Sequence, residues 1–510
     1  MWIKIALLLL FFAAMIAVGL RRRAKARSVD DFVLGGRNVG PWLSAFAYGT
    51  SYFSAVIFVG YAGQFGFKYG IASTWVGIGN AILGSLLAWV VLGRRTRVMT
   101  NHLSSSTMPD FFGKRFGSQK LKIAASAIVF IFLVPYTASI YNGLSLLFEM
   151  AFDVPYAVCV VAMAALTGLY VVLGGYMATA ITDFIQGLIM LGGIVLVIAS
   201  VLAQNGGFLA ALNALSQIES EVALTAGQQG AYASFFGPDP LNLLGVVVLT
   251  SLGTWGLPQM VHKFYAIKNE KAVQTGTIVS TIFALIVAGG CYFLGGFGRL
   301  YDSPQLYNAE GAIVYDRIMP TMLGTLSDAV IAVIIVLVLS ASMSTLASLV
   351  LSSSSTLTLD FISCLVAKDM SERGKLRCMR LLIVFFIAVS VLLALDPPTF
   401  IAQLMGISWG ALAGAFLAPF LYGLYWKRTT CAAAWASFVS GIGITLSNMV
   451  FGYISSPINA GAIAMLAGLV IVPLVSLLTK APQAVMLQDI FSCYEEKVLV
   501  PRKYSLKRDH

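Results

Sequence analysis

Long apolar runs, separated by short polar stretches or by glycine and proline, alternate along the whole chain. A helix that crosses a bilayer needs about 20 largely apolar residues, and the runs are of roughly that length or longer. Glycine and proline at the breaks mark where one helix ends and the next begins. The pattern predicts an all-α polytopic membrane protein with thirteen membrane-spanning helices, at residues 2–20, 42–66, 71–92, 121–149, 155–173, 176–204, 241–262, 273–298, 325–352, 379–396, 399–425, 430–453 and 460–478.

Two of the predicted helices carry breaks near the middle of the membrane. The helix at 42–66 concentrates small and hydroxyl residues at 45–55, and the helix at 241–262 contains Gly256 and Pro258. Unwound backbone is tolerated at membrane depth only where it is buried in protein or lines a cavity. The two helices are five apart and run in opposite directions, as the first helices of two inverted repeats would. Tight packing through small residues is the alternative explanation.

Hydroxyl side chains form a stripe on the predicted helix at 325–352. At 3.6 residues per turn, one face of this helix carries Ala341, Ser344, Thr345, Ser348 and Ser352. Uncharged oxygen ligands suit a weakly held monovalent cation, whereas a divalent cation usually recruits carboxylates. The stripe therefore indicates a monovalent cation site beside unwound backbone. The competing interpretation is that the hydroxyls bond to preceding carbonyls or join helices together.

Composition and charge agree with a membrane protein. Of the 510 residues, 58% are hydrophobic and 11% are charged, with a mean hydropathy of +0.86, which leaves no room for a large soluble catalytic domain. The net charge of +11 does not indicate nucleic-acid binding, because 29 of the 33 Lys and Arg residues fall in alternate loops of the predicted topology. Basic loops face the cytoplasm. We therefore expect the plasma (inner) membrane, with the N-terminus outside and the C-terminus cytoplasmic.

The remaining chemistry of the sequence excludes several classes of function. The six Cys and three His residues are scattered, so no metal site or cofactor other than a transported ion is expected. No histidine is placed at mid-membrane to activate a serine nucleophile, so we do not predict an enzyme. The alternatives to a transporter that uses such a monovalent cation are a channel or uniporter without ion coupling and a proton-coupled symporter. The expected partners are a small-molecule substrate, the ion and the bilayer, with no obligatory protein partner.

Three ordered motifs resemble the sodium:solute symporter family, in the branch that contains the sodium/proline and sodium/pantothenate symporters. They are LGGRNVGPW at 34–42, Gly174-Gly175 followed by TDFIQ at 182–186, and ASMSTL at 341–346. The resemblance extends over essentially the whole chain and implies a LeuT-type core of two inverted five-helix repeats. It divides the chain into a first helix with a basic linker (1–40), a first repeat (41–204), an outer loop (205–240), a second repeat (241–425), two peripheral helices (426–478) and a cytoplasmic tail (479–510).

The resemblance also implies where sodium binds. The ligands carried over by motif position are the carbonyl oxygens of Thr50, Phe53 and Ala341 and the hydroxyls of Ser344 and Thr345.

Asp183 matches the family's aspartate on the sixth helix, and a carboxylate inside a membrane is costly enough to expect a role. The resemblance implies ion release or a second ion site for Asp183 with Ser348, although Ala347 interrupts the pair of hydroxyls found in relatives that have a second ion. The alternative is that the carboxylate is only favoured by a helix dipole.

The substrate is expected between the breaks of the helices at 42–66 and 241–262. The broken parts of these helices contain no Lys or Arg, so a substrate carboxylate would be held by helix N-termini and hydroxyls. We expect a small organic solute, carboxylate-bearing, such as proline, pantothenate or a monocarboxylate. The resemblance places Tyr52 where proline symporters have an aspartate. Each aromatic residue here has packing as its alternative role; the predicted contact residues are Tyr52, Ile57, Tyr136, Tyr141, Trp255 and Gln259.

Overall fold

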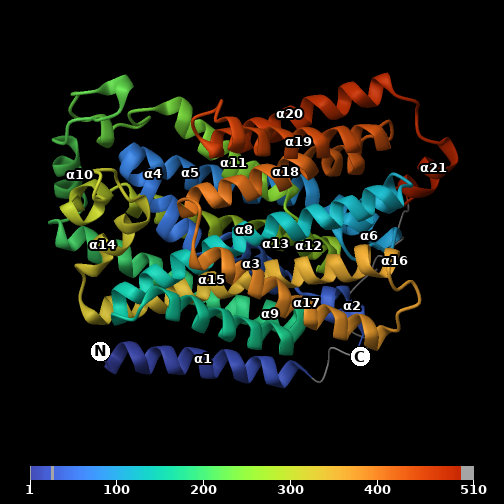
Figure 1. Ribbon diagram of the computed structural model, residues 1–510, viewed down its shortest axis with the longest axis horizontal. Helices are drawn as coiled ribbons and strands as arrows, with labels where there is room; N and C mark the ends of the chain where they lie inside the picture. The colour runs from blue at the N-terminus through green and yellow to red at the C-terminus, as the bar shows by residue number, and fades with distance from the viewer. Residues whose placement is uncertain (1, 24–27, 496–510) are drawn as a thin grey trace, which may run out of the picture.

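The computed structural model describes residues 2–23 and 28–495 of the chain. In these two stretches every regular element is a helix, and the β-type pairings are two isolated bridges. Figure 1 shows the long helices running side by side along the long axis of the molecule, with short helices and loops at both ends. The predicted all-α class is confirmed.

The long helices are α1 (Trp2–Arg23), α8 (Gln119–Phe152), α9 (Tyr156–Gln204), α11 (Pro240–Gly256), α13 (Glu270–Gly295), α15 (Asp328–Thr356), α17 (Glu372–Leu395), α18 (Ile401–Tyr425), α19 (Cys431–Phe451) and α20 (Pro457–Leu478). Shorter helices complete the bundle and its ends: α2 (Val29–Leu34), α3 (Pro41–Tyr52), α4 (Ala62–Tyr69), α5 (Thr74–Gly79), α6 (Arg94–His102), α7 (Met108–Arg115), α10 (Phe208–Ser216), α12 (Pro258–Ala266), α14 (Ile318–Gly324), α16 (Ser363–Leu365) and α21 (Ala484–Ser492). Wider π-type turns occur at η2 (Val56–Tyr61), η4 (Asn80–Leu87), η5 (Trp89–Gly93) and η11 (Leu357–Ile362).

The predicted count of thirteen spans is not reached by helix length and hydropathy. In the described part of the chain, nine helical runs are long and apolar enough to cross a membrane, and the bent pair α11–α12 makes a tenth. Two further apolar helices, Trp2–Val18 and Tyr156–Leu169, are shorter. The predicted second and third spans share one continuous run, Val56–His102, in which Gly70 adopts φ +62° and ψ −143° between α4 and α5.

Both predicted breaks are present. Helix α3 ends at Tyr52, Phe53 is extended with φ −103° and ψ 127°, and helical geometry resumes at Ala55. Leu257 is likewise extended between α11 and α12, whose axes differ by 46°. Pro258 starts α12, where its missing N–H removes no helical hydrogen bond.

Burial separates the helices into a centre and a periphery. The apolar stretch of α18 is 89% buried and that of α15 is 78% buried, against 33% for α17 and for α19. The exposed apolar side chains of α17 and α19 include Leu381, Phe385 and Val439, which suits contact with lipid tails. Helix α15, which carries the hydroxyl stripe, is therefore a central helix of the bundle.

Close contact between α4 and α13 depends on glycine. A Cβ atom placed on Gly66 would lie 1.9 Å from the carbonyl oxygen of Gly295, so no side chain fits without separating the two backbones. Overpacking of this kind costs about 1–3 kcal/mol or more. We expect Gly66→Ala to lower the melting temperature of the purified protein by several degrees. Gly192→Ala is the matched control, because nothing lies within 4 Å of its Cβ position; equal melting temperatures for the two variants would contradict this packing.

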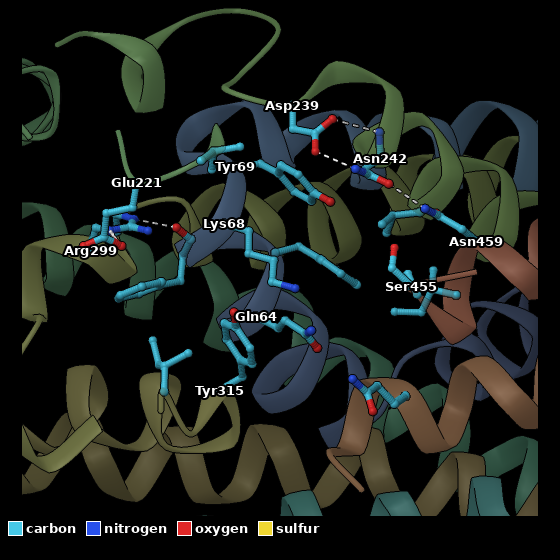
Figure 2. Close-up of a pocket in the computed structure, with 18 of the residues that line it drawn as sticks. Gln64, Lys68, Tyr69, Glu221, Asp239, Asn242, Arg299, Tyr315, Ser455 and Asn459 are labelled. Carbon is cyan, nitrogen blue, oxygen red and sulfur yellow. Dashed lines mark hydrogen bonds and ion pairs between the residues drawn. The ribbon is translucent and has the colours of Figure 1, made fainter. Parts of the chain in front are cut away.

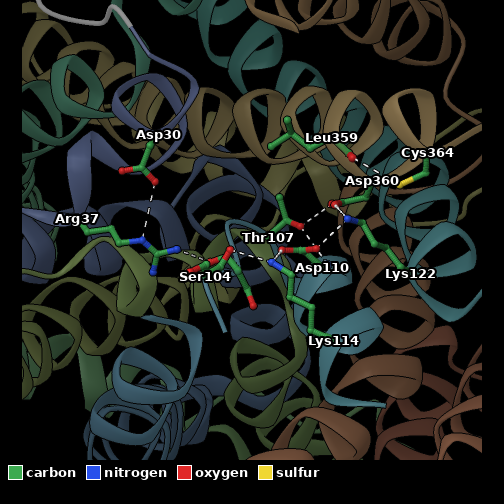
Figure 3. Close-up of polar contacts among 11 residues, drawn as sticks. Asp30, Arg37, Ser104, Thr107, Asp110, Lys114, Lys122, Leu359, Asp360 and Cys364 are labelled. Carbon is green, nitrogen blue, oxygen red and sulfur yellow. Dashed lines mark hydrogen bonds and ion pairs between the residues drawn. The ribbon is translucent and has the colours of Figure 1, made fainter. Parts of the chain in front are cut away.

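A buried polar network joins the ends of α7, α8 and η11 (Figure 3). The Asp360 carboxylate accepts a hydrogen bond from Thr107 and lies 3.2 Å from the Lys122 ammonium, which is 2.7 Å from Asp110. The segment between the predicted spans 71–92 and 121–149 is thus largely helical, as α6 and α7, and this network ties it to η11, which directly follows α15. The described part of the predicted tail, residues 479–495, includes α21. The rest of the tail, residues 496–510, and residues 24–27 of the predicted basic linker lie outside the part of the chain that the structure describes.

The opposite end of the molecule carries α10, α14 and a cavity of about 560 Å³ (Figure 2). The Arg299 guanidinium donates to the Phe67 carbonyl at 2.7 Å and pairs with Glu221 at 3.0 Å, which fixes one wall of the cavity.

Asp316 caps α18 by accepting the Ile401 N–H at 3.1 Å, and burial raises the pKa of this carboxyl to about 6.

Candidate functional site

Five oxygen atoms converge where the broken end of α3 meets the middle of α15. The Ser344 hydroxyl lies 3.0 Å from the carbonyl oxygens of Thr50 and Ala341. The Thr345 hydroxyl lies 3.1 Å from the Thr50 carbonyl oxygen and 2.8 Å from that of Phe53. It also lies 3.0 Å from the Ala341 carbonyl oxygen. All five residues are at most 1% exposed. We call these five atoms the oxygen cluster.

The oxygen cluster has more acceptors than protons. Its two hydroxyl groups hold two protons, yet five oxygen–oxygen contacts of 2.8–3.1 Å connect them to three carbonyls. A hydroxyl donates one hydrogen bond at a time, so several buried lone pairs face one another. A small monovalent cation would satisfy these lone pairs without requiring a fixed negative charge. The oxygens present therefore fit sodium.

The backbone break creates the α3 half of the cluster. In an unbroken helix the Phe53 carbonyl would accept the Ile57 N–H, but that N–H bonds the Ser54 carbonyl at 3.0 Å. The Phe53 carbonyl is left to face Thr345. The Ser342 hydroxyl accepts the Ala55 N–H at 3.1 Å and so holds the resumed helix against α15. Ser342 lies off the hydroxyl stripe and is a structural anchor of the break.

A second polar group lies next to the oxygen cluster and includes a residue that sequence reasoning did not select. The Ser348 hydroxyl is 2.7 Å from the Ser51 hydroxyl and accepts a hydrogen bond from the Lys263 ammonium at 3.0 Å. Lys263 is 2% exposed and lies within α12, whereas the predicted span 241–262 ends one residue before it. Asp183 is 0% exposed on α9, and neither carboxylate oxygen has a hydrogen-bond partner among the described residues. The one sequence feature that could have identified Lys263 is its position five residues after Pro258, which breaks the span.

Of the predicted substrate contacts, Tyr52 and Tyr136 meet at a third aromatic residue. Their rings lie 5.9 Å and 5.8 Å from the ring of Trp409 on α18. Trp409 also packs on Gly253, where an added Cβ would lie 2.5 Å from the indole. Sequence reasoning missed Trp409, because nothing local distinguishes it from a packing residue. The three rings join the break of α3 to α8, α11 and α18.

The other predicted substrate contacts are all buried, with different surroundings. The Trp255 indole N–H donates to the Leu83 carbonyl at 2.9 Å, a bond that fixes this ring against η4. Gln259 is 1% exposed, and neither atom of its side-chain amide has a partner among the described residues. Ile57 and Tyr141 are fully buried, on η2 and α8. Gln259 therefore has unsatisfied hydrogen-bonding capacity, whereas Trp255 does not.

The cavity in Figure 2 is separate from these residues along the bundle. Its wall includes Gln64 and Lys68 from α4 and Val246 from α11, and none of the six predicted substrate residues. Gln64 lies about two helical turns beyond Ile57, so one wall of the cavity belongs to the same broken span. Within residues 2–23 and 28–495, no group of three His, Cys, Asp or Glu side chains is placed to hold a metal ion.

Comparison with characterised proteins finds relatives over nearly the full length. The chain is 28% identical to the osmoregulated proline transporter OpuE of Bacillus subtilis, covering 93% of this chain and 94% of that protein. It is also 28% identical to the sodium/proline symporter of Escherichia coli, covering 93% of each.

Solved structures with the same fold include a Na⁺-coupled sialic acid symporter in a substrate-bound outward-open state. That structure has a TM-score of 0.75 at 19% identity and covers 94% of this chain and 98% of its own. A nucleobase-cation-symport-1 family transporter follows with a TM-score of 0.53 at 12% identity, over 91% and 98% of the two chains. The sequence profile of the sodium:solute symporter family matches residues 32–441. The chain, an all-helical multi-pass protein, belongs to the sodium:solute symporter family.

Proposed function

We propose that this protein couples inward movement of sodium to uptake of a small carboxylate-bearing solute by alternating access. The observation that carries the proposal is the oxygen cluster, in which the Ser344 and Thr345 hydroxyls meet the carbonyls of Thr50 and Phe53 at the break after α3. Family membership supports sodium as the coupling ion.

Proline is the first solute to test, because two relatives that match over 93% of the chain are named for proline. Tyr52, whose hydroxyl donates to the Thr250 carbonyl at 2.9 Å, provides no carboxylate for a substrate amine. Pantothenate and small monocarboxylates are therefore tested beside it. Gln259 and the rings of Tyr52, Tyr136 and Trp409 are the proposed contacts.

We also propose thirteen spans with the two inverted repeats at 41–204 and 241–425. The ten apolar runs become twelve with the two shorter helices and thirteen if Gly70 divides Val56–His102. In this proposed topology the protein spans the plasma membrane with its basic loops in the cytoplasm. Its N-terminus lies outside the cell and its C-terminus in the cytoplasm.

Uptake into proteoliposomes with sodium outside tests the function. One sodium ion crossing about 100 mV gains about 2.3 kcal/mol, and a tenfold gradient adds about 1.4 kcal/mol. One ion per solute could therefore sustain roughly 500-fold accumulation of a zwitterion such as proline. We expect uptake to cease when choline or potassium replaces sodium and to persist with a proton ionophore when the voltage is clamped. Uptake that survives without sodium would favour a uniporter, and loss with the ionophore would favour proton coupling.

A further inference from the structure

A buried cation of the protein itself lies beside the oxygen cluster. Ser348 is one helical turn beyond Ser344 on α15, and its hydroxyl contacts both Ser51 and the Lys263 ammonium. Lys263 approaches from α12, the second half of the other broken span. The Tyr176 ring, 5.0 Å from the ammonium, covers another side of this group. The ammonium therefore contacts a hydroxyl on the same face of α15 that provides the proposed sodium ligands.

Asp183 is buried near enough to Lys263 for the two charges to attract each other. Their charged atoms are more than 4 Å apart, since no ion pair forms between them among the described residues. A buried carboxylate without hydrogen bonds is unfavourable unless a cation compensates it. The Lys263 ammonium provides that compensation without direct contact.

We propose that the Lys263 ammonium takes the position of a second coupling cation, between Asp183 and Ser348, so that only one mobile sodium accompanies each solute. This inference rests on the proposed function, because it assumes that the oxygen cluster binds the first sodium. An ammonium and a sodium ion are both monovalent and both accept hydroxyl and carboxylate oxygens as neighbours. The tethered cation differs in one respect: it cannot cross the membrane, so it carries no charge through the transport cycle.

Replacement of the Lys263 side chain should turn this position into a binding site for a mobile sodium ion. Lys263→Ala leaves space between Ser51, Ser348 and Asp183, and it leaves the buried carboxylate uncompensated. A mobile sodium ion from solution would then be attracted to that space. Asp183→Asn added to Lys263→Ala removes the attracting charge and should abolish the new site.

Equilibrium binding of radioactive sodium to the purified protein tests this proposal. We expect one sodium per wild-type protein, two for Lys263→Ala with a Hill coefficient above one, and one for the double variant Lys263→Ala/Asp183→Asn. Lys263→Arg and Lys271→Ala, which removes an exposed lysine at the start of α13, should each bind one. A count of one for folded Lys263→Ala with the wild-type binding curve would overturn the proposal.

Asp183→Asn alone keeps the proposal testable if Lys263→Ala does not fold. If Lys263 already occupies the position, this variant should still bind one sodium. A wild-type count of two that falls to one in Asp183→Asn would mean that Asp183 holds a mobile ion, which contradicts the proposal. No sodium bound to the wild type would instead contradict the proposed function, so the two failures are distinguishable.

Discussion

Ser344→Ala and Thr345→Ala should each raise the sodium concentration for half-maximal uptake about tenfold or more. Each change removes one of about five oxygen ligands at a site whose residues are at most 1% exposed, so water cannot replace the missing oxygen. A hydrogen bond to a charged group is worth about 1.5–3 kcal/mol, or roughly 10- to 150-fold in affinity. Substrate affinity should recover at saturating sodium, because coupling between two ligands is reciprocal. Sodium titrations of uptake and of thermal stabilisation measure both effects.

The matched control is Ser353→Ala, which removes another buried hydroxyl from α15. The Ser353 hydroxyl has no hydrogen-bond partner in the described part of the chain, so its loss should leave sodium activation at the wild-type value. Ser342→Ala is unsuitable, because Ser342 anchors Ala55 at the break. If the cluster only joins helices, each loss would cost about 0.6 kcal/mol of stability, with no sodium dependence. Superimposable sodium curves for Ser344→Ala, Thr345→Ala and Ser353→Ala would reject the proposed site.

Gln259→Met should weaken solute binding about tenfold while leaving the melting temperature unchanged or slightly raised. Methionine keeps the approximate volume and removes an amide that is buried without a partner in the described residues. Leaving such a group unsatisfied costs about 1–3 kcal/mol in the absence of a ligand, so its removal should not destabilise the protein. The same amide bound to a solute would provide an energy of that order. Thermal shift measured with and without proline, pantothenate or a monocarboxylate separates the two effects.

Gln186→Met is the control for Gln259→Met. Gln186 is also fully buried, its side-chain oxygen has no partner in the described chain, and its amide nitrogen contacts only the Met15 sulfur at 3.5 Å. It lies on α9, outside the proposed substrate site, so solute binding should be unaffected. Equal loss of solute binding in both variants, or a lower melting temperature for Gln259→Met without loss of binding, would assign Gln259 a structural role.

The sequence by itself determined the helical class, the membrane location and both broken spans. Apolar runs of bilayer length have few alternatives to helices, because lipid satisfies no backbone hydrogen bond. Pro258 and the small residues before Phe53 mark the two breaks through the local sequence alone. The hydroxyl stripe at Ser344 and Thr345 follows from helical periodicity alone. The predicted count of thirteen spans is not confirmed, because the structure joins parts of the second and third predicted spans in one helical run, Val56–His102, that contains Gly70.

Only the tertiary structure decided which polar groups meet. Lys263 and Ser348 are 85 residues apart, and the contact between them depends on how α12 packs against α15. Trp409 likewise reaches Tyr52 and Tyr136 only because α18 lies at the centre of the bundle. Hydropathy reports whether a residue prefers lipid or water, but it carries no information on which helices are neighbours. Contacts between distant helices depend on the complementarity of whole surfaces, so they cannot be inferred from any single sequence position.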